Sequence, residues 1–226
     1  MRLAFPIMLG MLSQSVLNLI DAALVGHLGQ EALAGVGIGG YAMFMMTALV
    51  FGLSSSVQSQ TAHASGVEKA CTDQPFTTQP LRAGLMISLA IGLPLSCLAW
   101  WQAPALIQLI APSKEVTQIA LEYFRWRVVA LTVIALTLCL RGYWNGLQQT
   151  HLYLRIIVFV HVVNVALSAA LIYGIGGLPA LGVNGAAIGT TLSLLLGLFI
   201  WAVITWRQSP PLTRLLPSWH GVKVTL

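Results

Sequence analysis

The chain has 226 residues, of which 57% are hydrophobic and only 8% are charged, and its mean hydropathy is +0.83. Soluble domains carry about 25% charged residues, so the composition excludes a soluble globule, which would expose large apolar patches. The net charge of +5 does not indicate nucleic-acid binding, because the basic residues are scattered singly, without interleaved aromatic residues. The composition predicts an all-α integral membrane protein whose main partner is the lipid bilayer.

Six apolar stretches are long enough to cross a bilayer as helices, which takes about 20 residues each. The predicted spans are residues 3–25, 33–60, 82–103, 122–143, 153–174 and 184–206. Residues 105–120 alternate apolar and polar positions at helical spacing, which predicts a segment along the membrane interface before the fourth span. We predict one six-helix transmembrane domain over residues 1–206, then a polar cytoplasmic tail or the start of an inter-lobe linker over residues 207–226.

The distribution of Lys and Arg predicts how the chain is oriented, because cytoplasmic loops carry the excess of these residues. With the N-terminus inside, the basic residues of the inner side are Arg2, Lys69, Arg82, Arg141, Arg155, Arg207, Arg214 and Lys223. Those of the outer side are Lys114, Arg125 and Arg127. Both termini are therefore predicted to be cytoplasmic.

The glycine-rich stretch 35–40 looks superficially like a dinucleotide-binding loop, but no strand precedes it and it opens a predicted span. Gly35 and Gly39 are four residues apart, as are Gly185 and Gly189. This spacing of small residues predicts close helix packing within the membrane.

Asp21 is the only acidic residue in the interior of a predicted span, because Glu122 stands at the end of the fourth. A carboxylate there costs at least about 2.5 to 3.5 kcal/mol, so it is a candidate for function. Counting about 1.5 Å per residue from the span ends places Asp21, Ser168 and Thr190 at one level, with Asn164 one turn deeper. These oxygens could line a hydrated pocket for a proton or a monovalent cation. The alternative is that they form hydrogen bonds between helices, worth about 0.6 kcal/mol each.

Other polar residues give weaker indications. His161 lies in the middle of a predicted span and could be either a proton relay or a packing histidine. No nucleophile with a matching base and orienting acid is visible, so an enzyme is not predicted. The remaining histidines show no metal-ligand spacing, and neither a metal site of this kind nor a cofactor is predicted.

Four sequence features together resemble one transporter family. They are Ala-Phe-Pro ending at Pro6, Ile-Asp-Ala-Ala-Leu-Val-Gly-His-Leu-Gly around Asp21, Arg-Gly-Tyr-Trp-Asn-Gly-Leu-Gln from Arg141, and Gly-Val-Asn-Gly-Ala-Ala-Ile-Gly-Thr ending at Thr190, with Asn164 between the last two. In this order, they are similar to the N-terminal half of multidrug and toxic compound extrusion transporters, most of all the DNA-damage-inducible-protein-F-like branch.

The resemblance implies two six-helix lobes around a central cavity, from which drugs leave as H⁺ or Na⁺ enters. It implies that Asp21 is the coupling carboxylate, with Asn164, Thr190 and the Ala186 carbonyl at the matching ion-site positions. If Na⁺ is the coupling ion, the resemblance implies that it binds at Asp21, Asn164 and Thr190. It also implies that the first span bends at Pro6.

One departure from the family concerns the ion site, where Ser168 replaces a second aspartate of this branch. The loss of a negative charge favours H⁺ over Na⁺ as the coupling ion. The expected function is a cation-coupled antiporter lobe that exports amphipathic, often cationic, small molecules across the bacterial inner membrane.

A second departure is length, because the family has about twelve spans and six are predicted here. A second six-helix lobe, from another copy or a separate gene, is an expected partner. The alternatives are a truncated, inactive half-transporter and a non-transporting membrane assembly partner.

Overall fold

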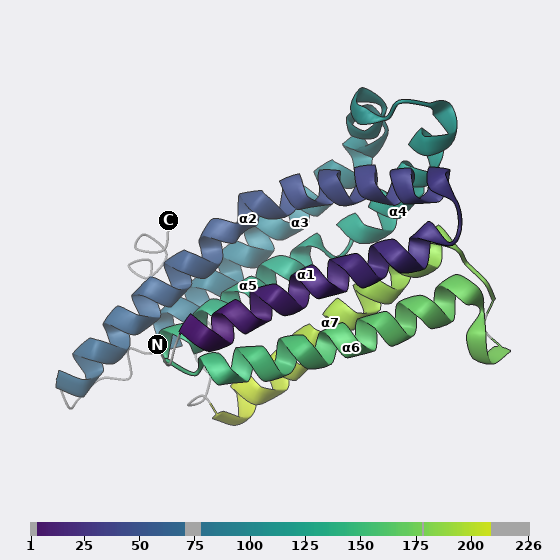
Figure 1. Ribbon diagram of the computed structural model, residues 1–226. Helices are drawn as coiled ribbons and strands as arrows, with labels where there is room; N and C mark the ends of the chain where they lie inside the picture. The colour runs from purple at the N-terminus through teal and green to yellow at the C-terminus, as the bar shows by residue number, and fades with distance from the viewer. Residues whose placement is uncertain (1–3, 71–77, 178, 209–226) are drawn as a thin grey trace.

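The computed structural model describes residues 4–70, 78–177 and 179–208, and these residues form helices and short connections without strands. The elements are α1 (Ala4–Gly26), α2 (Gln30–Ala70), α3 (Gln79–Ile110), α4 (Lys114–Val128), α5 (Leu131–Gly146), α6 (Thr150–Tyr173), the short 3-10 helix η2 (Ile175–Gly177) and α7 (Val183–Gln208). Figure 1 shows them as an elongated bundle in which α1 begins and α7 ends at the same end. The predicted tail lies outside the described residues from residue 209 onward.

Five helices are long and apolar enough to cross a membrane, namely α1, α2, α3, α6 and α7. α4 and α5 pass the same test only as a pair, which is bent by 47° and would count as a sixth span by length and composition. The prediction of one continuous span over residues 122–143 is therefore wrong. The Ala130 N–H donates to the Arg127 carbonyl, 3.0 Å away, so a tight turn replaces the regular helix there.

Two further predicted boundaries differ from the structure. α2 is longer than the predicted span, because helical hydrogen bonding continues through polar residues that hydropathy marks as loop. Residues 105–120 do not form one interfacial helix: α3 continues to Ile110, and α4 begins at Lys114. Ser113 ends the connection between them by capping α4, since its side chain accepts a hydrogen bond from the Val116 N–H.

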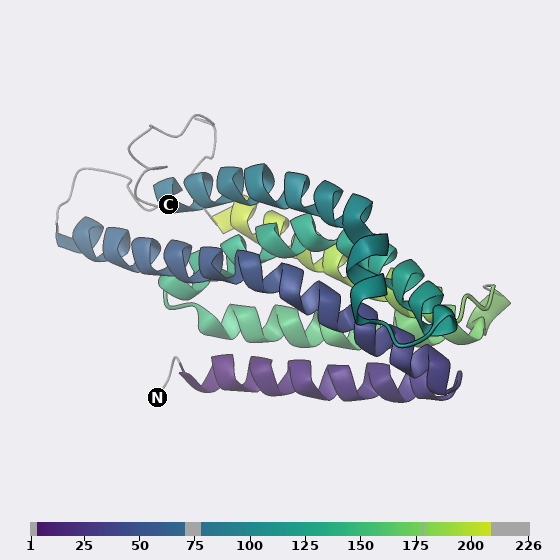
Figure 2. The ribbon, with the colours of Figure 1, turned by 90° about the horizontal axis from the view of Figure 1, so that it is seen from above.

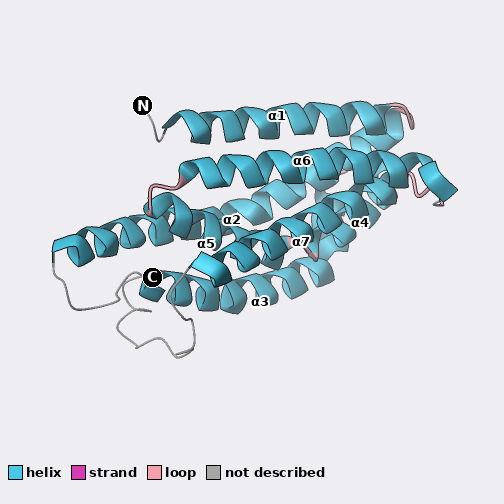
Figure 3. Ribbon diagram, turned by 90° about the horizontal axis from the view of Figure 1, so that it is seen from below, coloured by secondary structure: helices cyan, strands magenta, loops and turns pink. Residues whose placement is uncertain are grey.

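The helices share three apolar cores. One lies among α2, α3, α4 and α5 and includes the fully buried Phe124 and Leu131. A second joins α5 to α6 and α7 around Trp144 and Trp201. The third, around Val25, joins the end of α1 to α2, α4, α6 and α7. Figures 2 and 3 show α1 at one edge of the bundle, beside α6.

Both predicted glycine pairs lie at close helix contacts. Gly35 and Gly39 face α4, where an added Cβ would come within 2.5 and 2.9 Å of a side-chain atom. Gly185 and Gly189 face α6, where an added Cβ would come within 2.5 and 2.8 Å of a backbone atom. The prediction of packing through small residues is confirmed at both pairs.

Candidate functional site

Among the described residues, three hydrogen bonds join α1 to α6. The Tyr173 hydroxyl donates to the Leu24 carbonyl, 2.8 Å away. His161 forms hydrogen bonds with Ser13 (Nδ1 to Oγ, 2.7 Å) and with Gln14 (Nε2 to Oε1, 3.1 Å). The paired residues are separated by 147 to 149 positions in sequence. The two helices therefore run parallel in a constant register.

This register places Asp21 at the level of Ser168, because these two residues have the same separation in sequence as Gln14 and His161. α7 runs antiparallel to α6, with Gly189 packed against Ser168 and the Asn164 amide donating to Ser193 Oγ, 3.0 Å away. Asp21 on α1 and Ser168 on α6 thus share a level with the start of α7. Counting residues from the span ends predicts this same level.

The site is marked by buried oxygen atoms that have no hydrogen-bond partner. They are Asp21 Oδ1, Asn164 Oδ1 and Ser168 Oγ, and none of the three is paired within the described residues. The Asn164 and Ser168 side chains are each 1% exposed. A buried polar atom without a partner costs about 1 to 3 kcal/mol. Binding of a proton or a cation by these oxygens would offset that cost.

The other two predicted ion ligands contact each other. The Thr190 hydroxyl donates to the Ala186 carbonyl, 2.9 Å away on the preceding turn of α7. The Thr190 oxygen keeps its lone pairs, so it could accept a hydrogen bond or contact a cation. The Ala186 carbonyl would have to share its oxygen with that hydroxyl. The geometry therefore favours Thr190 over Ala186 as an oxygen ligand.

Ser193 belongs to the site but was missed by sequence reasoning. It is buried, accepts from the Asn164 amide and donates to the Thr190 carbonyl, 2.8 Å away. By fixing the amide nitrogen of Asn164 toward α7, it leaves the Asn164 oxygen free. The spacing of polar residues in the sequence indicates it: Ser193 lies about one turn deeper than Thr190, as Asn164 lies one turn deeper than Ser168.

Arg127 was also missed, because hydropathy places it at the end of a span. Its guanidinium on α4 is near enough to interact electrostatically with Asp21. Within the described part of the chain, no ion pair joins the two residues, and Arg127 Nε is buried without a partner. Asp21 is therefore not neutralised by a direct arginine contact.

His161 is buried and has both ring nitrogens in hydrogen bonds to α1. Of the two predicted roles, this arrangement favours a packing histidine that connects α6 to α1. A proton relay would need an onward partner at the level of Asp21. The contacts of His161 instead run to Ser13 and Gln14, which lie deeper along α1 than Asp21 does.

Pro6 lies in the first turn of α1. The first four N–H groups of a helix have no acceptor within it, so the missing N–H of Pro6 breaks no hydrogen bond of the described helix. From there α1 continues without interruption to Gly26. Bending at Pro6 stays a prediction.

The chain matches the MatE family model over residues 6–170. A probable multidrug resistance protein NorM of Bradyrhizobium diazoefficiens is 34% identical over 213 residues, and the multidrug resistance protein PmpM of Pseudomonas aeruginosa is 29% identical over 205 residues. These alignments cover 92% and 89% of this chain but only 44% and 42% of the relatives. The chain thus spans less than half the length of these relatives.

Solved structures of transporters also match this chain over about half of their own length. A MOP superfamily transporter from Pyrococcus furiosus matches 100% of this chain and 49% of its own length, with a TM-score of 0.85 at 25% identity. A MATE protein in a bent conformation matches with a TM-score of 0.85 at 26% identity, over 98% of this chain and 49% of that one. The branch within the family stays a prediction. The chain belongs to the MatE family of multidrug and toxic compound extrusion transporters and folds as one lobe of their structure.

Proposed function

We propose that this chain forms the N-terminal lobe of an antiporter that exports amphipathic, often cationic, small molecules across the bacterial inner membrane while protons enter. The names of its relatives support multidrug efflux. The observation that carries the coupling role is the group of unpartnered buried oxygens of Asp21, Asn164 and Ser168. A carboxylate with a buried oxygen that has no hydrogen-bond partner, at the level of Ser168, fits a group that binds and releases a cation during transport.

Protons are the proposed coupling ion because the site holds a single carboxylate. Ser168 contributes a neutral oxygen, so a sodium ion at Asp21, Asn164 and Thr190 would meet only one negative charge. A proton needs only the carboxylate itself. In the proposed cycle, Asp21 takes up a proton from the outer side as drug leaves and releases it toward the cytoplasm as the lobe resets.

A second six-helix lobe is the proposed partner, supplied by another copy or by a separate chain. α1 sits at the edge of the bundle and leaves large apolar side chains exposed along its length, among them Met8, Met11 and Leu19. In a two-lobe transporter, part of such a surface would face the other lobe and the cavity between them. An inactive half-transporter or a non-transporting assembly partner would show no efflux in any pairing.

The substitution Asp21→Asn tests this proposal. We suggest fusing the chain to the C-terminal lobe of a relative and measuring accumulation of a cationic dye in cells that lack their own efflux pumps. Glu31→Gln is the matched control, because Glu31 is an exposed acid at the start of α2. We expect Asp21→Asn to abolish efflux at equal membrane levels and Glu31→Gln to retain it.

Two outcomes would contradict the proposal. Efflux by the Asp21→Asn protein would remove Asp21 from the mechanism. Efflux in everted vesicles that requires a sodium gradient, and does not respond to a proton gradient, would replace the proton by Na⁺ as the coupling ion.

A further inference from the structure

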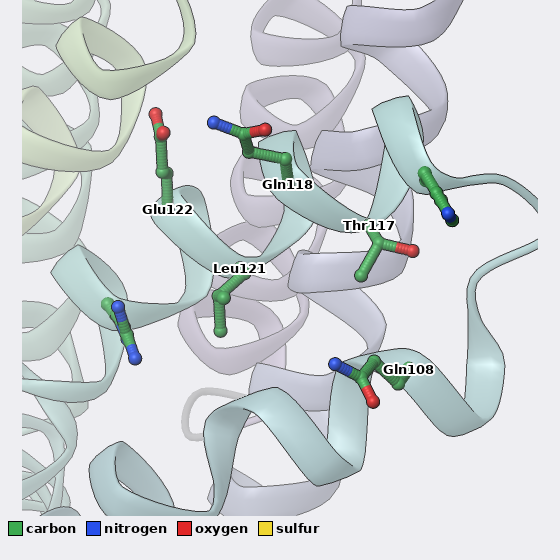
Figure 4. A pocket seen from close by; sticks show the side chains of 7 residues that line it. Gln108, Thr117, Gln118, Leu121 and Glu122 are labelled. Carbon is green, nitrogen blue, oxygen red and sulfur yellow. The ribbon is translucent and has the colours of Figure 1, made fainter.

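A cavity of about 750 Å³ lies away from this site, between the end of α3 and α4. Its lining residues are Gln108, Lys114, Thr117, Gln118, Leu121, Glu122 and Arg125. In Figure 4, Gln108 comes from α3, whereas the other labelled residues come from α4. All but one of the lining residues are polar, and they lie at the end of α3 and along α4 from its first residue.

The cavity carries a net positive charge, since Lys114 and Arg125 outnumber Glu122. Glu122 is already engaged, because its Oε2 accepts from the Asn184 amide of α7, 3.1 Å away. Among the described residues, neither basic residue forms an ion pair, and Arg125 Nε is buried without a partner. The guanidinium of Arg125 lies over the Trp100 ring, 5.3 Å from its centre. The cavity therefore offers two basic side chains, neither in an ion pair among the described residues, to an anion.

Exposed apolar side chains of α3 adjoin this polar cavity. Leu109, next to Gln108, is 88% exposed, and Trp101 is 72% exposed. Trp101 lies seven residues before Gln108, or about 10 Å along the helix. A molecule that fits both features has an anionic head and an apolar tail.

We propose that this cavity binds the headgroup of an anionic phospholipid. Lys114 and Arg125 hold the phosphate, because charged donors form the strongest hydrogen bonds to phosphate oxygens. Gln108 and Gln118 supply further amide donors to the headgroup. The acyl chains lie along α3 over Trp101.

Lipid binding to the purified chain tests this assignment. We suggest native mass spectrometry of the full chain in mild detergent, titrated with phosphatidylglycerol or with phosphatidylcholine. We expect phosphatidylglycerol to bind in preference to phosphatidylcholine. The double substitution Lys114→Gln with Arg125→Gln should lower its affinity about 25-fold, since each basic residue near an anionic membrane contributes about fivefold.

The matched control is Arg155→Gln with Arg207→Gln, which removes two exposed basic residues that lie outside the cavity. We expect this control to bind phosphatidylglycerol as the unsubstituted chain does. Size-exclusion elution and thermal unfolding of both double variants establish that each is folded.

Three results would overturn the proposal. Equal binding of the two lipids would show that the charge of the headgroup is not recognised. Unchanged phosphatidylglycerol binding after the Lys114 and Arg125 substitutions would place the lipid elsewhere. Displacement of the lipid by millimolar inorganic phosphate would assign the cavity to free phosphate.

Discussion

The substitution Gly189→Ala tests how closely α6 and α7 are packed beside the ion site. An added Cβ would lie 2.8 Å from both the backbone nitrogen and the Oγ of Ser168, whereas ordinary contact begins at 3.4 Å. The helices would have to separate by about 0.6 Å, and such overpacking costs about 1 to 3 kcal/mol. Replacement of glycine by alanine within a helix also stabilises the folded state, by about 0.5 to 1 kcal/mol. The net effect is a destabilisation of up to about 2.5 kcal/mol.

Gly37→Ala is the matched control, because no atom lies within 4 Å of a Cβ added at Gly37 in α2. It carries the same gain in helix propensity without the overpacking, so the two variants should differ by about 1 to 3 kcal/mol in free energy of unfolding. The assay is reversible unfolding in mixed micelles of increasing SDS content, followed by tryptophan fluorescence. Equal stability of the two variants would refute the described contact between Gly189 and Ser168.

Two further substitutions probe individual hydrogen bonds. Trp144→Phe removes the indole donor to Thr205 Oγ1, 3.0 Å away in the core. A double-mutant cycle with Thr205→Val, measured by the same unfolding assay, should give a coupling of about 0.6 and at most about 1.7 kcal/mol, and zero coupling would exclude the bond. His161→Leu removes the bonds to Ser13 and Gln14. Hydrogen exchange of α1 should then rise while that of α3 is unchanged, and an unaltered α1 would contradict the anchoring role of His161.

The number and place of the spans could be predicted from the sequence because lipid imposes apolar runs of a nearly fixed length. The break between α4 and α5 could not, since Val129 and Ala130 are neither proline nor glycine and carry no signal of a helix end. The close contacts of Gly142 and Gly146 with α2 were missed although these glycines show the same four-residue spacing as the predicted pairs. They lie at a span end, where glycine also indicates a loop.

The candidate site was predictable in depth but not in its hydrogen bonding. Helical rise fixes the level of Asp21 and Ser168, because each residue adds a constant length. The direction of a side chain depends on which helices are neighbours, and hydropathy does not contain that information. The bond from Asn164 to Ser193 exists only because α6 and α7 lie side by side. The bond from Thr190 back to Ala186 lies within α7 and depends on the rotamer of Thr190, which the sequence does not specify.

The dependence of α1 on α6 has a consequence for biosynthesis. The two residues of the Ser13–His161 bond are 148 positions apart in the chain. At ribosomal rates of about 5 to 20 residues per second, α1 is made roughly 7 to 30 s before His161. During that interval, the translocon and the surrounding lipid must hold a nascent segment that carries an acid but lacks its final neighbour. Docking of α1 onto α6 is therefore a late step in the folding of the lobe.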